Sequence, residues 1–404
     1  MLTFPTFEEA RALLMERTAA VDCERLPLSD CGGRVLAQDL CAEADIPPFD
    51  RSPYDGYAFR GEDTLGASRE TPVTLRILEE IPAGGVPHYT VTEGTAVKIL
   101  TGAPIPPGAD TVCKYEETDY SDDAVTLYAP CKRGDNIVYA GEDVKKGTVL
   151  APAGSVIDAG LAGTLAAQGV TEPSVYRHPH VALISTGSEL LDIGDELAEG
   201  KIRNSNRYML EAALVQNGLE PVSYGTVGDD VNAIARLFAE AAASCDAVIS
   251  TGGVSVGDYD LSPAAMELAG AETLIRGVGI KPGKSCAFAA LNGKVLYGLS
   301  GNPAAALTDF YAIALPALKK LAGRRDCLPR ELTLRLKSGF RKKSPYTRLL
   351  RGRLDLSDGM PAIELPGDQS NSVLSSTIGS DVMAIIPPEV GPMAEGETLK
   401  GFLL

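Results

Sequence analysis

Histidine is scarce in this sequence, and closely spaced cysteine pairs are missing. The 404 residues include three histidines and eight cysteines, and no two cysteines stand in a C-x-x-C pair. Structural zinc sites are built from such pairs and from histidine, so we do not expect a zinc site. Three histidines also give no convincing Ser–His–acid set, which argues against a serine-hydrolase mechanism.

Positive charge and long apolar runs are also lacking. Lysine and arginine number 37 against 54 acidic residues, which gives a net charge of −17. Nucleic acid and anionic membranes attract basic surfaces, so neither is an expected partner. No apolar run reaches the ~18 residues that span a bilayer. The start "MLTFPTFEEARALLMER" is typical of an amphipathic helix and not of a signal peptide, and we expect a cytoplasmic protein with reduced thiols.

The pattern of apolar residues changes along the chain and indicates several domains. Between residues 46 and 143, short β-branched runs alternate with Gly- and Pro-rich turns, which predicts a β-rich domain. Between 178 and 328, strands such as "HVALIST" and "DAVIST" alternate with helices. That alternation predicts an α/β domain with a parallel sheet covered on both faces. The segment 329–404 alternates again and predicts a small β-barrel. The expected fold class is therefore multidomain α/β.

The first candidate site is "STGSEL", directly after a predicted strand. Ligands of open parallel sheets bind outside the carboxyl ends of the strands. Thr186, Gly187 and Ser188 offer backbone N–H groups and hydroxyls that could cradle an anion or a pterin, and Glu189 would project beside them. The alternative is an ordinary strand-to-helix turn with a serine cap.

The second candidate site is "STGGVSVGDYD", after the next buried strand. Gly252, Gly253 and Ser255 would let the backbone approach a phosphate closely. Asp260 and its neighbour Asp258 would repel that phosphate unless a cation intervened, so Mg²⁺ is the natural inference. Asp229, at the end of a further strand, could be another ligand. The alternative is a Gly-rich turn that carries solvated acids.

Two further loops complete the predicted rim. In "KPGKS", Lys281 and Lys284 form a compact positive clamp for an oxyanion, with solvated surface lysines as the alternative. In "LSGNPAAA", Asn302 and Pro303 begin a helix whose N-terminus could hold an anion, and they could also serve only to cap it. Together the four loops predict a site for a phosphate ester and a second oxyanion. The site is not a P-loop, since no G-x-x-x-x-G-K-[ST] follows a strand.

These motifs, with others, occur in a characteristic order. "SPYDGYA", "TGAPIPPGAD", "GDNIVYAGED", "STGSEL", "NSN", "TGGVSVGDYD", "KPGK" and "GNP" together resemble the MoeA family of molybdopterin molybdenumtransferases, to which the gephyrin E domain also belongs. The resemblance implies insertion of molybdate into adenylylated molybdopterin with release of AMP, dependent on Mg²⁺. It also implies a homodimer whose active cleft lies between the α/β domain of one subunit and the β-rich domain of the other.

The resemblance implies four domains and a set of site residues. The domains would be a discontinuous linking domain at 1–45 and 144–177, a β-rich domain at 46–143, a molybdopterin-binding α/β domain at 178–328 and a C-terminal β-barrel at 329–404. The pterin and AMP phosphates would lie along 185–189 and 250–260, and Mg²⁺ at Asp229 and Asp260. Molybdate would bind Lys281, Lys284 and Arg348. The remaining matches to functional positions are Asp55, Thr101, Asp143 and Glu189.

This chain departs from the family pattern at the expected oxyanion pocket. Ser300 replaces a proline, Ala305 a serine, and Asn371 stands where a further serine is expected. One hypothesis is a retuned oxyanion preference, for example for tungstate, or a weaker paralogue. A second is a non-catalytic molybdopterin carrier or scaffold of the same fold. A third is the sister activity, adenylylation of molybdopterin.

The proline-rich stretch "IPPFDRSPYDGYAFRG" predicts a stiff loop around Asp55. Pro47, Pro48 and Pro53 reduce the freedom of the unfolded chain. Gly56 would let the backbone turn directly after the acid. A loop of this kind can hold a carboxylate in one position.

Overall fold

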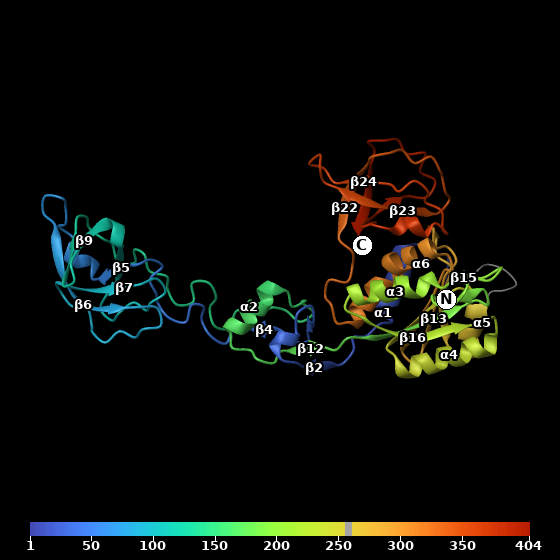
Figure 1. Cartoon of the computed structure of the whole chain (residues 1–404), viewed down its shortest axis with the longest axis horizontal. Helices are drawn as coiled ribbons and strands as arrows, with labels where there is room; N and C mark the ends of the chain where they lie inside the picture. Colours follow the sequence, from blue (N-terminus) through green and yellow to red (C-terminus); the bar gives the residue numbers. More distant parts are fainter. Residues whose placement is uncertain (255–260) are drawn as a thin grey trace. The chain divides into compact units, whose positions relative to one another are not determined.

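The computed structural model describes residues 1–254 and 261–404, in two compact units. The larger unit comprises Met1–Gln38, Ala153–Ala162 and Glu172–Leu404, and the smaller one Asp39–Pro152 and Gly163–Thr171. Figure 1 shows the helices and strands of both. The finer division into four domains stays a prediction. No helix among the described residues is long and apolar enough to cross a membrane.

A seven-stranded sheet forms the centre of the larger unit, in the order β1-β18-β20-β21-β17-β13-β16. Neighbouring strands are parallel from β16 through β13 and β17 to β21, as the sequence predicts. The strands are β1 (Leu2–Thr3), β13 (His180–Thr186), β16 (Glu220–Val227), β17 (Ala247–Thr251), β18 (Glu272–Arg276), β20 (Ala287–Leu291) and β21 (Lys294–Leu299).

The sheet is mixed: the predicted parallel part is present, and β20 departs from it. Strand β20 runs antiparallel to both of its neighbours, β18 and β21. The reason is a two-residue turn between β20 and β21, where Asn292 has φ 53° and Gly293 has φ 78°. Asn-Gly favours this left-handed backbone, and such a turn returns the chain as an antiparallel hairpin.

Helices cover both faces of this sheet (Figure 1). Val181 and Leu183 of β13 face the core under α1, α3, α6, η4 and α7, whereas Ala182 and Ile184 face the core under α4 and α5. This alternation is the two-residue period of a strand. The helices are α1 (Phe7–Glu16), α3 (Ser205–Gln216), α4 (Val231–Ser244), α5 (Leu261–Leu268), α6 (Pro303–Asp309), the π-helical turn η4 (Phe310–Ala314) and α7 (Leu315–Leu321).

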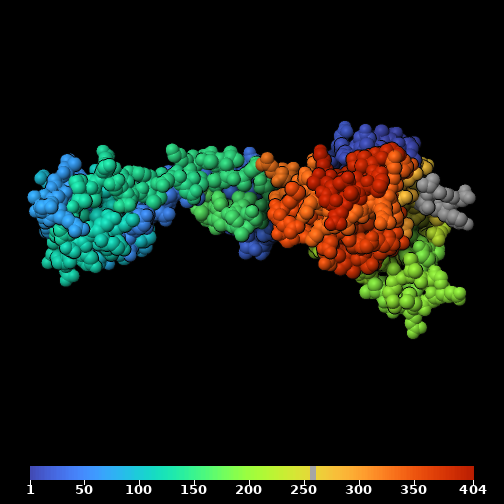
Figure 2. All heavy atoms as spheres, turned by 90° about the horizontal axis from the view of Figure 1, so that it is seen from above, coloured from blue at the N-terminus to red at the C-terminus, as the bar shows by residue number. Residues whose placement is uncertain are grey.

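The C-terminal part of the larger unit is a closed five-stranded barrel, as predicted. Strands β23, β24, β22, β26 and β25 pair in that order, and a pairing of β25 with β23 closes the ring. Strand β19 (Ile280–Lys281) pairs with β23 from outside the barrel. The red residues of Figure 2 form this block. Its elements are β22 (Glu331–Leu336), β23 (Thr347–Asp355), β24 (Ala362–Glu364), the 3₁₀ turn η5 (Leu374–Thr377), β25 (Val382–Ile386) and β26 (Thr398–Leu403).

Short elements complete the larger unit. A small sheet joins β2 (Cys23–Arg25), β12 (Ser174–Tyr176) and β3 (Val35–Leu36), and η1 (Leu28–Asp30) lies between β2 and β3 in the chain. Strand β14 (Leu190–Leu191) pairs with β15 (Ile202–Arg203).

The smaller unit is built on a six-stranded sheet, in the order β8-β5-β7-β6-β10-β9, which confirms the β-rich prediction. Tyr57 and Phe59 of β5 are fully buried in its core. The elements in this part of the chain are β4 (Leu40–Cys41), β5 (Gly56–Phe59), η2 (Gly61–Thr64), β6 (Val73–Ile81), β7 (Thr95–Ile99), β8 (Thr111–Lys114), η3 (Tyr115–Glu117), β9 (Thr118–Tyr120), β10 (Ala124–Leu127) and β11 (Val149–Ala151). Helix α2 (Ala159–Ala167) contributes residues to both units.

Candidate active site

A cleft of about 640 Å³ opens in the larger unit where β13, β17 and β21 end. Thr186 ends β13, Thr251 ends β17 and Ser300 follows β21, and all three line the cleft. The carboxyl ends of parallel strands are where open α/β sheets bind ligands. All four loops that the sequence predicts as a rim contribute lining residues.

The loop after β13 brings Thr186, Gly187 and Glu189 to the cleft. Gly187 has φ +142°, and a Cβ on it would lie 2.4 Å from Oε2 of Glu189. The Glu189 carboxylate therefore packs against the glycine backbone. The hydroxyl of Thr186 donates to the carbonyl of Thr251 at 3.2 Å and fastens this loop to the next strand.

Ser188 of the same loop holds Asp229. Its hydroxyl donates to Oδ2 of Asp229 at 2.5 Å, and its backbone N–H donates to the same oxygen at 3.3 Å. Lys201 in turn donates to the Ser188 carbonyl at 2.6 Å. Ser188 was predicted to contact a phosphate, and in the structure its donors orient the predicted metal ligand.

The oxygen ligands that the described residues offer would bind Mg²⁺ only together with oxygens from a substrate. Asp229 lines the cleft, and Mg²⁺ is commonly held by one or two carboxylates plus substrate phosphates. The other predicted ligand, Asp260, lies outside the described residues, as do Ser255 and Asp258. Within 1–254 and 261–404, no group of three or more His, Cys, Asp and Glu side chains could hold a metal by itself.

Two glycines after β17 let the backbone itself form the cleft wall. Gly252 has φ +92°, and a Cβ there would lie 2.4 Å from the Thr186 carbonyl oxygen. Gly253 has φ +64°, and a Cβ there would meet Oγ of Ser262 at 2.6 Å. Both positions therefore favour glycine. The close approach of this backbone to a phosphate stays a prediction.

Of the two lysines predicted to form a clamp, one lines the cleft. Lys284 lines it, and its ammonium lies 4.8 Å from the Phe4 ring centroid and 4.7 Å from that of Tyr346. Lys281 is exposed at the end of β19 and is not among the lining residues. It stands opposite Arg348 in the register of β19 and β23. Arg348 is buried over the Phe340 ring, and burial lowers the pKa of its guanidinium.

Asn302 and Pro303 line the cleft where α6 begins. Asn302 occupies the N-cap position, and its backbone carbonyl accepts from the N–H groups of Ala305 at 3.1 Å and Ala306 at 2.9 Å. Its side chain makes no capping hydrogen bond. The side-chain amide of Asn302 is therefore not used to cap α6 and can contact a ligand in the cleft.

Asn206 is a cleft residue whose role sequence reasoning missed. Its amide nitrogen donates to the Gly301 carbonyl at 2.8 Å, while its buried Oδ1 has no hydrogen-bond partner among the described residues. It lines the cleft. A buried acceptor without a partner costs stability unless a ligand supplies a donor. The signal lay in "NSN", one of the motifs of the family resemblance, in which Asn204 caps α3.

Arg351 is a second missed residue. It is 0% exposed; one Nη donates to Ser376 Oγ at 3.0 Å, and its Nε and other Nη have no partner in the described part of the chain. Burial lowers its pKa to about 10. "YTRLLRG" offers two arginines, and alternation alone did not show which one turns inward toward the segment around Ser376.

The three departures from the family pattern fall in different places. Ser300 and Asn371 line the cleft, and the Asn371 carbonyl accepts from the Ala304 N–H at 3.1 Å. Ala305 is buried in α6 and is not among the lining residues. Two of the three can therefore change the cleft surface directly.

Comparison with known proteins agrees with this architecture. Residues 5–169 match the MoeA N-terminal region (domain I and II), 182–320 a probable molybdopterin binding domain, and 333–403 the MoeA C-terminal region (domain IV). The molybdopterin molybdenumtransferase of Staphylococcus aureus strain COL is 37% identical over 380 residues, which cover 94% of this chain and 91% of the relative. The chain belongs to the MoeA family.

Other members are similarly close. The molybdopterin molybdenumtransferase of Staphylococcus epidermidis is 38% identical over 369 residues, covering 91% of this chain and 88% of that protein. The crystal structure of the molybdopterin biosynthesis moeA protein from Pyrococcus horikoshii OT3 superimposes with a TM-score of 0.86 at 32% identity. That match covers 99% of this chain and 100% of the other. The MoeA fold therefore extends over the whole chain.

Two of the site residues predicted from the resemblance, Asp55 and Thr101, meet in the smaller unit. Oδ1 of Asp55 accepts hydrogen bonds from the backbone N–H and the hydroxyl of Thr101, both at 2.7 Å. These two bonds lower the pKa of the exposed Asp55 carboxyl, because they stabilise its charged form. Asp55 is thus held as an oriented carboxylate.

The surroundings of Asp55 explain part of the sequence motif. A Cβ at Gly56 would lie 2.1 Å from the Cys113 carbonyl oxygen, so glycine is required by the close approach of β8 and not by a turn. Tyr57 and Phe59 anchor the segment in the core, whereas Tyr54 is 42% exposed. The backbone N–H of Asp143 donates to the Ile46 carbonyl at 3.0 Å, at the start of the same stretch.

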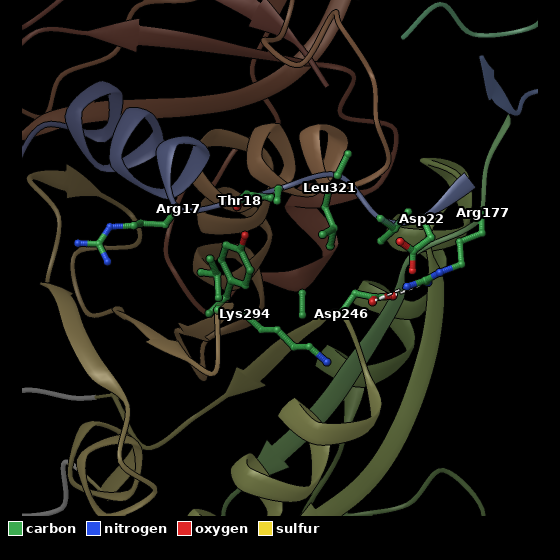
Figure 3. A pocket seen from close by; sticks show the side chains of 14 residues that line it. Arg17, Thr18, Asp22, Arg177, Asp246, Lys294 and Leu321 are labelled. Carbon is green, nitrogen blue, oxygen red and sulfur yellow. Dashed lines mark hydrogen bonds and ion pairs between the residues drawn. The ribbon is translucent and has the colours of Figure 1, made fainter. Parts of the chain in front are cut away.

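A second cavity of the larger unit, of about 210 Å³, lies at the opposite ends of the sheet strands (Figure 3). Arg177 donates to both carboxylate oxygens of Asp246, each at 2.7 Å, and Asp246 also accepts from the His180 N–H at 2.8 Å. These bonds fasten the starts of β13 and β17.

Proposed function

We propose that this chain inserts molybdate into adenylylated molybdopterin and releases AMP in a reaction that depends on Mg²⁺. As a member of the MoeA family, it is an enzyme of molybdenum cofactor biosynthesis, a molybdopterin molybdenumtransferase. The adenylylated substrate, the AMP product and the metal are the proposed part. The supporting observation is the cleft, which gathers two backbone glycines, Asp229, Lys284 and Asn302 at one edge of the sheet.

The cleft residues divide between the two anionic groups of the proposed reaction. Gly252 and Gly253 would admit the phosphates of the substrate against bare backbone. The ammonium of Lys284, which lies against the rings of Phe4 and Tyr346, would attract molybdate. Asp229, oriented by Ser188, would hold Mg²⁺, and the bound ion would neutralise charge that develops on the phosphates.

The smaller unit would supply the carboxylate. Asp55 is kept ionised and oriented by Thr101, so it can orient a water molecule and accept its proton. We propose a homodimer in which Asp55 of one subunit serves the cleft of the other, with Asp143 near the start of the same loop. This arrangement would explain why the loop around Asp55 is stiff.

A retuned oxyanion preference is the second candidate, and one observation favours it. Ser300 and Asn371, which replace the expected proline and serine, both line the cleft. A changed hydrogen-bonding surface would alter the discrimination between molybdate and tungstate. Indistinguishable affinities for the two oxyanions in isothermal titration would rule this candidate out.

The decisive experiment measures AMP release from adenylylated molybdopterin by the purified protein. We expect release when molybdate and Mg²⁺ are both present, and little release when either is omitted or Mg²⁺ is chelated. Equal release without molybdate would contradict the coupled reaction. Tight molybdopterin binding without any AMP release would favour a carrier or scaffold, and ATP consumption would favour adenylylation.

A further inference from the structure

A buried acid contacts two of the loops that line the cleft. Asp309, the last residue of α6, is 0% exposed. Its Oδ2 accepts from the Ser300 backbone N–H at 3.4 Å, and its Oδ1 has no hydrogen-bond partner among the described residues. A Cβ at Gly283 would lie 1.8 Å from this Oδ1. The carboxyl therefore touches two loops at once, the K-P-G-K loop and the S-G-N-P loop.

These two loops carry the residues with which the cleft would hold an anion. Gly283 and Lys284 line the cleft from one loop, and Ser300 and Asn302 line it from the other. Asp309 itself is not among the lining residues. Any effect of Asp309 on a ligand is therefore exerted through the loops or through its charge.

The surroundings of Asp309 favour a neutral carboxyl. Burial raises its pKa well above the ordinary value, and the single N–H from Ser300 opposes this only in part. Across the part of the chain that the structure describes, no lysine or arginine forms an ion pair with it. The nearby titratable groups are Cys286, which directly precedes β20 and whose own pKa is raised by burial and by Asp309, and Lys281 and Lys284 of the K-P-G-K loop.

Asp309 is paired with one of the departures from the MoeA pattern. Position 300 carries a serine where that pattern has proline, and proline has no N–H to donate. The Ser300 N–H is the donor that reaches Asp309. The serine at position 300 and the acid at position 309 are thus joined by a hydrogen bond that a proline at position 300 could not make.

We propose that Asp309 is a positioning residue for the oxyanion: its neutral carboxyl seats Gly283 and Ser300, and its ionisation weakens anion binding in the cleft. A negative charge there would repel an oxyanion and, being buried without a partner, would push the two loops apart. The inference rests on the proposed function, since it takes the anion to be the oxyanion substrate. It adds a residue and a pH dependence that the proposed function does not require.

The test is the affinity for molybdate, measured by isothermal titration at a series of pH values from acidic to alkaline. The variant Asp309→Asn keeps the shape of the neutral acid and cannot ionise. We expect it to bind within about twofold of the wild type at the acidic end. At the alkaline end the wild type should bind at least about tenfold more weakly than the variant. Loss of charge from lysines affects both proteins equally.

Two further variants sharpen the result. Ser300→Pro removes the N–H that favours the ionised form, so the fall in affinity should move to higher pH. Asp326→Asn, which changes an exposed acid of the same unit, should keep the wild-type profile. Thermal unfolding provides a separate measure of ionisation: Asp309→Asn should stabilise the protein more at alkaline than at acidic pH.

The possible failures can be told apart. Superimposed profiles for the wild type and Asp309→Asn would overturn this inference and leave the proposed function standing. No molybdate binding by the wild-type protein at any pH would overturn both. A variant Asp309→Asn that binds weakly at every pH would also overturn it, because a neutral isostere would then fail to replace the acid.

Discussion

Asp55 shows what a single residue contributes when its neighbours fix its state. Both hydrogen bonds from Thr101 end on one carboxylate oxygen, at 2.7 Å each, and they lower the pKa of the group. A carboxyl with a lowered pKa stays ionised at neutral pH and turns into the neutral acid only at low pH. It can therefore act as an oriented acceptor over the whole physiological range.

We predict that Asp55→Ala lowers kcat for AMP release by about 10²-fold or more, the size typical of a lost general base. Binding of molybdopterin should be unchanged, because the cleft belongs to the other compact unit. A matched control is Asp122→Ala, which removes an exposed acid from the same unit. A normal kcat in Asp55→Ala would remove Asp55 from the mechanism.

Ser188 offers a second test at the scale of one side chain. Its hydroxyl donates to Asp229 at 2.5 Å and fixes the carboxylate that would hold Mg²⁺. In Ser188→Ala the carboxylate keeps only the longer bond from the backbone N–H of residue 188, at 3.3 Å, so the Mg²⁺ concentration that gives half-maximal AMP release should rise by roughly tenfold. Ser188→Thr keeps the hydroxyl and should stay close to the wild type. An unchanged Mg²⁺ requirement in Ser188→Ala would separate Asp229 from the metal.

At the scale of elements, the sequence predicted the parallel strands of the larger unit and the edge of the sheet where the cleft lies. The short apolar runs in "HVALIST" and "DAVIST" were sufficient to predict strands, because both strands are buried on two faces. The direction of β20 was missed, although Asn292 and Gly293 carried the signal for a hairpin. Local periodicity reports which face a residue occupies but not how strands are paired, since pairing is set by turns and by distant partners.

Periodicity also could not show which of the two arginines of β23 faces the segment around Ser376. Arg348 packs over Phe340, while Arg351 is fully buried with unpartnered N–H groups and reaches Ser376 of η5. The two positions point to opposite faces of one strand. Which face would meet the segment that carries Asn371 depends on the closure of the barrel, and no local pattern encodes that closure.

The environment of Arg351 leads to a prediction that separates stability from binding. A buried, unpaired guanidinium is costly, and an apolar side chain of similar size is often neutral or stabilising in its place. If its unpartnered N–H groups serve the oxyanion, Arg351→Met should keep or raise Tm while it weakens molybdate binding by roughly tenfold or more, the cost of losing charged hydrogen bonds. Calorimetry and isothermal titration measure the two effects. A large fall in Tm with normal affinity would assign Arg351 a structural role alone.

At the scale of the whole molecule, the acid and the cleft belong to different compact units. Asp55 lies within Asp39–Pro152, whereas every lining residue of the cleft lies within Glu172–Leu404. The resemblance to the MoeA family led to this expectation, since composition and periodicity indicated separate domains but not which chain completes the site. In the proposed homodimer, Asp55 of each subunit would complete the cleft of the other subunit.

Mixing two inactive variants tests this arrangement. Asp55→Ala removes the acid, and Lys284→Ala removes a cleft cation that is not in the same unit. If the site is shared between subunits, a mixed dimer has one doubly altered site and one intact site. Random reassociation of equal amounts should then restore about one quarter of wild-type activity, because half of the dimers are mixed and each has one working site. Each variant alone should stay inactive under the same treatment. If one subunit supplied both residues to its own site, every site in the mixture would still carry one lesion, and no activity would return.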